Sequence, residues 1–210
     1  MNALDLNAIE IAKPIFDPFE HVIVPEVISK THLSSVIDEF PEVNKSGSFP
    51  VSDVKCGPNF KILMKELNSE IFAKKIGSKL GIDLSNKPRM ITIRGYCRQS
   101  DGKIHTDSKG KLVTVLIYLN SSWQKEGGRL RLLYNNHDIE NFAAELPPYQ
   151  GSMVAFACHP HSWHGHHSYE GKRKMIQLNW VVSRNYKIRE ELRHNLSSHF
   201  KKFFSLPLAE

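Results

Sequence analysis

The residues His105-Thr106-Asp107 and Ser162-Trp163-His164-Gly165-His166 decide how this chain must fold. On an extended segment, residues two apart point to the same side, so the His105 imidazole and the Asp107 carboxylate can reach one point. A third ligand from a distant strand would complete a set of two histidines and one carboxylate, and we select His164. Such a set leaves positions open on one side of the metal and suits non-haem Fe(II) that binds a cosubstrate and O₂. The fold must therefore bring these two distant stretches together.

The composition is that of an ordinary globular protein. The chain has 210 residues, of which 40% are hydrophobic and 24% charged, and this length fits one domain. No apolar run approaches the length of a membrane span, and the acidic N-terminus does not resemble a signal peptide. Cys56, Cys97 and Cys158 are far apart and form no CxxC pair, so we expect free thiols and a cytoplasmic location.

The charge balance is basic, with 28 Lys and Arg against 22 Asp and Glu, and the net charge is +6. A basic soluble protein is the simpler interpretation, since net charge bears on solubility and partners rather than on fold. An anionic or nucleic-acid partner is the alternative. The basic residues are scattered, with short clusters only at 172–174 and 201–202, and no nucleic-acid motif is present. We therefore expect no nucleic-acid partner.

Residues 1–88 are expected to form a mostly helical lead-in that packs on a core. A short strand is expected at 22–24, and apolar residues at helical spacing then follow Pro25 up to Phe40. Residues 42–60 are rich in Ser, Gly, Pro and Asn and predict a loop. Helical spacing returns over 62–80, and Gly81 is placed to end that helix.

From residue 89 the pattern changes to strands. Residues 90–96 alternate, 113–119 are apolar and rich in β-branched residues, and shorter runs follow up to 182, punctuated by Gly and Pro turns. About seven short strands with such turns predict a sandwich or jelly roll over 89–183. Residues 184–210 are expected to form a basic helix that packs on this core through an apolar face made of Ile188, Leu192, Leu196, Phe200, Phe203 and Phe204.

Residues 158–167 contain five of the chain's 11 histidines. They could be a solvated loop, or they could bind Zn or Ni by themselves in a jelly-roll protein that binds or senses without redox chemistry. In a third interpretation one histidine completes the set with His105 and Asp107, and the others surround the site. Arg173 favours the third interpretation, because a buried Arg can hold a carboxylate through two parallel hydrogen bonds.

Several motifs, in this order, resemble those of the iron(II)/2-oxoglutarate-dependent dioxygenases, and most closely the prolyl 4-hydroxylase-like branch. They are HTD at 105–107, VLIYLN followed by SSW at 115–123, EGGRLRLL at 126–133, LPPYQGSMVAF at 146–156 and SWHGHHSYEGKRKMIQLNWV at 162–181. The resemblance implies a mainly β fold with flanking helices and a double-stranded β-helix (jelly-roll, cupin-like) core. It also implies an enzyme that uses Fe(II), 2-oxoglutarate and O₂.

Carried over to this chain, the resemblance implies that His105, Asp107 and His164 bind Fe(II). In the family a basic residue follows the distal His at a spacing that His164 and Arg173 match. Arg173 would thus hold the distal carboxylate of 2-oxoglutarate. Lys174 is the alternative, because a slip of one residue turns every side chain of a strand to the other face.

The resemblance also concerns two tyrosines and the substrate. Tyr96 matches a position where the family often uses Tyr to bind 2-oxoglutarate, although a packed aromatic is the alternative. Some relatives use a second Tyr on the strand after HTD, where the best-aligned position here is Ile117, with Tyr118 adjacent. Related halogenases lack the carboxylate of Asp107, so hydroxylation with release of succinate and CO₂ is implied. The branch acts on peptidyl, amino-acid and other small-molecule substrates.

Overall fold

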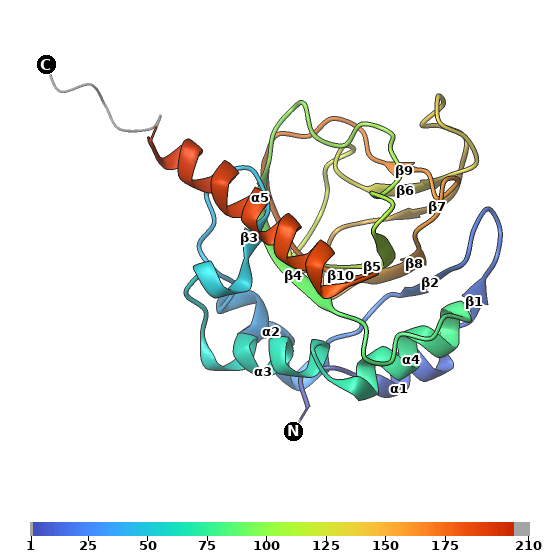
Figure 1. Cartoon of the computed structure of the whole chain (residues 1–210), viewed down its shortest axis with the longest axis horizontal. Helices are drawn as coiled ribbons and strands as arrows, with labels where there is room; N and C mark the ends of the chain where they lie inside the picture. The colour runs from blue at the N-terminus through green and yellow to red at the C-terminus, as the bar shows by residue number, and fades with distance from the viewer. Residues whose placement is uncertain (1, 204–210) are drawn as a thin grey trace, which may run out of the picture.

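The computed structural model describes residues 2–203, and the side chains of residues 2–193. Two antiparallel β-sheets make up the core of the fold, and four helices of the N-terminal part cover the outer face of the larger sheet (Figure 1). The mainly β fold with flanking helices and a jelly-roll core is therefore confirmed.

The larger sheet has the strand order β1-β2-β8-β5-β10-β4-β3 and the smaller one β7-β6-β9. The strands of the larger sheet are β1 (Pro14–Ile15), β2 (His21–Val24), β8 (Met153–Ala157), β5 (Lys111–Tyr118), β10 (Gly171–Val181), β4 (Arg89–Cys97) and β3 (Phe49–Pro50). Those of the smaller sheet are β7 (Phe142–Leu146), β6 (Leu130–Leu133) and β9 (His164–Gly165). The long strands β4, β5 and β10 lie side by side and form the floor on which the site is built.

The lead-in contains four α-helices and one 3-10 turn within the described residues. They are α1 (Leu6–Ile11), α2 (Lys30–Asp38), the 3-10 turn Val51–Asp53, α3 (Pro58–Leu67) and α4 (Glu70–Leu80). The sequence predicted one helix over 62–80, but the structure has two. The Ser69 hydroxyl accepts a hydrogen bond from the Phe72 amide and so caps a new helix start. Gly81, with φ of 68°, ends α4 in the left-handed conformation.

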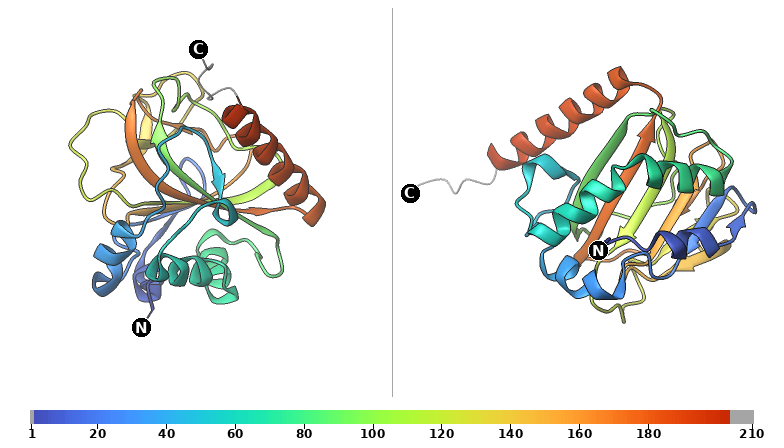
Figure 2. Two further views of the ribbon diagram at one scale, coloured as in Figure 1. Left: turned by 90° about the vertical axis from the view of Figure 1, so that its left-hand side faces the viewer. Right: turned by 90° about the horizontal axis from the view of Figure 1, so that it is seen from below.

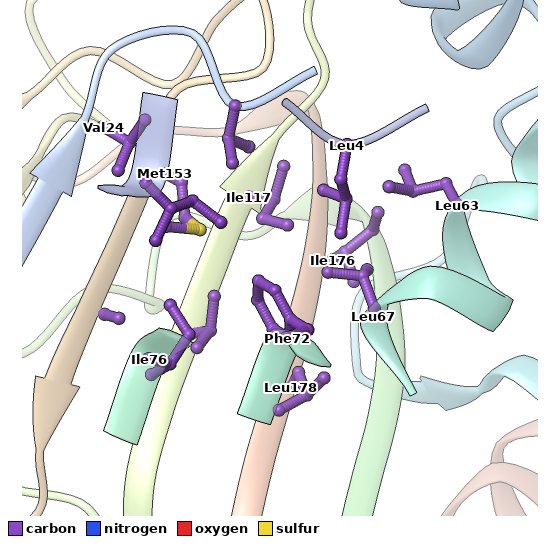
Figure 3. Packing of buried hydrophobic residues seen from close by; sticks show 14 of the residues in the cluster. Leu4, Val24, Leu63, Leu67, Phe72, Ile76, Ile117, Met153, Ile176 and Leu178 are labelled. Atoms are coloured by element: carbon purple, nitrogen blue, oxygen red, sulfur yellow. The ribbon is translucent and has the colours of Figure 1, made fainter. Parts of the chain in front are cut away.

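Both faces of β5 are covered, which explains why that strand is apolar almost throughout. Val113, Val115 and Ile117 face the helices and join the larger hydrophobic cluster. Figure 3 shows this cluster, with Ile117 of β5 near Phe72 and Ile76 of α4. Leu116 and Tyr118 face the smaller sheet and belong to a second cluster. The space between the sheets is thus reached by every second side chain of β5.

The last helix, α5 (Arg184–Phe203), lies against β3 and β10 and does not join the helices of the lead-in (Figures 1 and 2). Ile188 and Leu192 are 54% and 57% exposed, so this part of the predicted apolar face does not pack on the core. Glu190 is buried instead. The other residues of that face, Leu196, Phe200, Phe203 and Phe204, lie outside the described side chains. No helix within residues 2–203 is long and apolar enough to cross a membrane.

Candidate metal and cosubstrate site

A cavity of about 330 Å³ opens between the two sheets. Inward-pointing residues of β4, β5 and β10 line its floor, and β9 lines its opposite side. His105, Asp107 and His164 all face this cavity, and one ligand atom from each lies within 4.8 Å of the others. The structure therefore brings the two stretches singled out in the sequence to one point.

His105 and His164 are held next to each other by their backbones. The His105 amide donates to the His164 carbonyl and the His164 amide to the His105 carbonyl, both at 3.0 Å. This is a directly paired position of two antiparallel strands. The two ring centroids consequently lie 4.3 Å apart.

Both imidazoles are oriented in the same way. Nδ1 of His105 donates to the Lys103 carbonyl at 2.8 Å, and Nδ1 of His164 donates to the Ser162 carbonyl at 2.9 Å. A carbonyl only accepts, so Nδ1 carries the proton and Nε2 keeps a free lone pair. Such a backbone contact is the usual support of a metal-binding histidine. Both rings are thus prepared to bind a metal through Nε2.

Asp107 is ionised and held by its neighbours. Lys111 donates to Oδ1 at 2.6 Å and the Thr114 hydroxyl donates to Oδ2. Burial alone would raise the pKa of Asp107, but the charge of Lys111 and the hydrogen bonds from Lys111 and Thr114 lower it to about 2. Asn179 in turn donates to the Thr114 hydroxyl at 2.6 Å, so the carboxylate sits at the end of a chain of contacts.

The histidine that completes the group is neutral. Burial and the neighbouring His105 lower the pKa of His164 to about 4. The three side chains thus offer two imidazoles, that of His164 neutral at neutral pH, and one carboxylate. This donor set, with one side facing the open cavity, fits Fe(II).

Arg173 lies at the other end of the cavity and is only 6% exposed. Its Nε donates to the Gly128 carbonyl at 2.8 Å, and one terminal nitrogen donates to the Tyr118 hydroxyl at 3.2 Å. Lys174 points to the opposite face, where its Nζ donates to the Ile37 carbonyl and lies over the Phe40 ring. Of the two basic candidates, only Arg173 faces the cavity.

Tyr96, Tyr118 and Arg94 line the same end of the cavity. Tyr118 is fully buried, and burial raises its pKa. Ile117, the position best aligned in the sequence, packs in the core beneath the sheet instead. The sequence thus indicated Tyr118 only as the neighbour of Ile117, and it did not indicate Arg94, whose pKa is lowered by burial. Every second residue of a strand faces the same side. Thr114 on β5 therefore indicates Tyr118, and Tyr96 on β4 indicates Arg94.

The remaining histidines of 158–167 are dispersed. His159 contacts Glu20 at 3.1 Å, His167 contacts Glu140 at 2.6 Å, and His161 is exposed. His166 lines the cavity, and burial followed by the charge of Arg173 lowers its pKa to about 4. Among residues 2–193, the single group able to share a metal ion is His105, Asp107 and His164. These histidines therefore do not form the separate Zn or Ni site considered from the sequence.

Comparison with known proteins agrees with this geometry. The model of the 2OG-Fe(II) oxygenase superfamily matches residues 91–182, whereas no curated protein sequence matches the chain. A Pseudomonas putida prolyl-4-hydroxylase is 14% identical over 84% of this chain and 90% of its own, with a TM-score of 0.56. A Trichoplax adhaerens prolyl hydroxylase, solved with a hypoxia inducible factor oxygen degradation domain peptide fragment, is 18% identical over 85% and 87%, with a TM-score of 0.52.

A viral collagen prolyl hydroxylase from Paramecium Bursaria Chlorella virus-1, solved with 2OG, is 11% identical over 80% of this chain and 99% of its own, with a TM-score of 0.51. At these identities the likeness is one of fold. The superfamily consists of oxygenases that use Fe(II), 2-oxoglutarate and O₂, which the donor set described above fits. The family match over residues 91–182, the fold and the donor set together indicate a 2-oxoglutarate-dependent oxygenase with the fold of the prolyl 4-hydroxylases.

Proposed function

We propose that this oxygenase binds Fe(II) through His105, Asp107 and His164 and hydroxylates a C–H bond of a peptidyl, amino-acid or other small-molecule substrate. The observation that carries the proposal is the convergence of these three ligand atoms within 4.8 Å on one side of a cavity. Bound Fe(II), together with 2-oxoglutarate and O₂, supplies the oxidising chemistry that puts oxygen into the C–H bond and releases succinate and CO₂.

The residues of this chain have separate tasks in that reaction. Nε2 of each histidine and one oxygen of Asp107 hold the metal, while Lys111 and Thr114 keep the carboxylate ionised and oriented. We assign Arg173 to the distal carboxylate of 2-oxoglutarate, with the Tyr118 hydroxyl and Tyr96 beside it. A guanidinium that is nearly fully buried at the end of a cavity is suited to a carboxylate partner.

The first test is the visible charge-transfer band that forms when Fe(II) and 2-oxoglutarate are added to metal-free protein without oxygen. We expect the band in the wild type and its loss in Asp107→Ala and His164→Ala. These variants should also lose Fe(II)-dependent conversion of 2-oxoglutarate to succinate. His161→Ala, which alters an exposed histidine of the same segment, is the matched control and should keep both signals.

Two outcomes would contradict the proposal. One is the absence of the band in fully reduced wild-type protein that is otherwise folded. The other is full turnover of 2-oxoglutarate in both Asp107→Ala and His164→Ala. Zn must be excluded from the preparation, because it binds such ligands more tightly than Fe(II) does.

We further propose that the enzyme works in the cytoplasm. Cys56, Cys97 and Cys158 are all free thiols, and Cys158 lies 3.8 Å from Asp107. Burial and the Asp107 charge raise the pKa of Cys158 to about 12, so the thiol stays protonated beside the metal ligands. Free thiols and a ferrous site both suit a reducing compartment. Cell fractionation tests this assignment, and recovery from an oxidising compartment would contradict it.

A further inference from the structure

We propose that α5 forms the substrate-binding wall of the cavity and that Glu190 on this helix binds a cationic group of the substrate. The substrate would be a free amino acid or a peptide residue with a primary ammonium group. This inference rests on the proposed function, because it concerns the molecule oxidised at the same site.

The first turn of α5 is attached to the segment that follows Asp107. The Tyr186 hydroxyl lies 2.6 Å from the Ser108 hydroxyl, and the Val182 amide donates to the Gly110 carbonyl at 3.0 Å. The Tyr186 ring packs so closely on Gly110 that a Cβ there would lie 2.0 Å from it. These contacts hold α5 beside one metal ligand, and the helix runs on against β3, as Figure 1 shows.

Two residues of α5, Glu190 and Arg193, line the cavity between the sheets. Glu190 is only 8% exposed. Its Oε2 accepts a hydrogen bond from Arg193 at 2.5 Å, and within the described residues no group donates to Oε1. Oε1 is not among the fully buried polar atoms that lack a partner, so it remains accessible to a ligand. Glu190 therefore offers one carboxylate oxygen to a molecule in the cavity.

Arg193 is a partner that a substrate can replace. Its side chain is 69% exposed, whereas that of Glu190 is 11% exposed, so the guanidinium reaches in from solvent. An ion pair whose cation is exposed to solvent contributes little to stability. A substrate cation held inside the cavity would face less competition from water than the Arg193 guanidinium does. Binding can thus exchange one cation for another at Glu190.

The charges of the cavity are divided between its two ends. The end near Tyr118 carries Arg94 and Arg173, which suits the dianion 2-oxoglutarate. Of the other carboxylates that line the cavity, Asp101 is bound by Arg98 and Arg94, and Asp107 by Lys111 and Thr114. Neutral side chains, namely Ser48, Met90, Gln177 and Asn179, also line it. Glu190 is consequently the carboxylate left for a substrate.

The test uses the anaerobic complex of the full-length enzyme with Fe(II) and 2-oxoglutarate. Substrate probes are titrated while the charge-transfer band is followed, which reports binding without turnover. L-lysine is compared with L-norleucine, which has the same carbon chain without the terminal ammonium. Gly-Gly-Lys-Gly-Gly is compared with its norleucine counterpart, so that the two pairs distinguish a free amino acid from a peptide residue.

We expect one lysine probe to bind about tenfold or more tightly than its norleucine partner, as hydrogen bonds to charged groups do. Glu190→Gln should remove most of this preference. Arg193→Met removes the competing guanidinium and should strengthen binding of the same lysine probe. Glu191→Gln is the matched control. It removes an equal charge from the next residue, whose half-exposed side chain pairs with Lys187. It should leave the preference unchanged.

Three results would overturn the inference. They are equal binding of the lysine and norleucine probes, binding of neither lysine probe, and a preference that persists unchanged in Glu190→Gln. Each of them requires that the charge-transfer band has formed in the wild type. Absence of the band itself would instead contradict the proposed function, so the two failures are distinguishable. If Glu190→Gln does not fold, the Arg193→Met result decides, since weakened or unchanged lysine binding there contradicts the exchange of cations.

Discussion

His105 and His164 exchange two backbone hydrogen bonds, each 3.0 Å long, although they lie in segments far apart in the chain. Each ring is also tied at Nδ1 to the carbonyl of the residue two positions before it. The position and the rotation of both imidazoles are thus set by backbone groups rather than by flexible side chains. A site prepared in this way needs little rearrangement when a metal binds.

Arg173→Gln should raise the KM for 2-oxoglutarate about hundredfold or more. Truncating one partner of a buried charged pair costs about 2–5 kcal/mol of binding free energy. Lys174→Gln, its neighbour on the other face of β10, should change this KM little. Initial rates of succinate formation at varied 2-oxoglutarate measure both. A larger effect of Lys174→Gln would contradict the strand register described here.

Tyr118→Phe should raise the KM for 2-oxoglutarate about three- to tenfold, the loss of one hydrogen bond. The removed hydroxyl accepts from Arg173 at 3.2 Å and keeps the guanidinium aimed into the cavity. Ile117→Val, one residue away, alters the core on the other side of the sheet and is the control. Equal KM values for Tyr118→Phe and the wild type would show that Arg173 is held in place without this contact.

Lys111→Met should weaken metal binding about 10- to 100-fold, the range found when groups that orient a ligand are removed. The variant leaves all three ligands in place and removes the 2.6 Å contact to Asp107. Titration with Co(II), followed through its visible absorption, measures this without turnover. Lys109→Met alters an exposed lysine of the same segment and should bind Co(II) like the wild type. Unaltered affinity in Lys111→Met would argue that Thr114 alone orients the carboxylate.

His21→Phe should make the protein less sensitive to acid. His21 is 1% exposed, its Nδ1 contacts the Phe19 carbonyl, and its Nε2 is buried without a partner. Burial lowers the pKa of His21 in the folded protein below the ordinary value of 6.5. Below pH 6.5 the unfolded protein therefore binds a proton at His21 more readily than the folded protein does. His21 thus leaves the free energy of unfolding unchanged above pH 6.5 and lowers it as the pH falls below 6.5.

Urea unfolding at pH 7.5 and pH 5 tests this prediction. The loss of stability between the two pH values should be smaller in His21→Phe than in the wild type. His137→Gln, at an exposed histidine, should lose as much as the wild type does. A loss in His21→Phe equal to that of the wild type would mean that His21 is protonated in the folded protein.

Local sequence predicts the long strands and the chemistry of the site. Alternation and β-branched runs in β4, β5 and β10 follow from local preferences, as does the Gly81 position at a helix end, whereas Pro58 begins α3 inside the loop expected over 42–60. The pair His105 and Asp107 needs only an extended backbone to act together. These features depend on residues that are close together in the sequence, so the sequence alone predicts them.

Which side chains of each strand point into the cavity depends on how the strands pair and pack in the folded protein. A slip of one residue exchanges Arg173 for Lys174 or Tyr118 for Ile117, and β10 has an irregular register between Lys172 and Met175. The position of α5 likewise depends on contacts across the fold, which buried Glu190 and left Ile188 and Leu192 exposed. The strand register and the position of α5 are set by pairing and packing between segments that are distant in the chain. The energies of these contacts depend on residues of both segments, so neither segment alone predicts them.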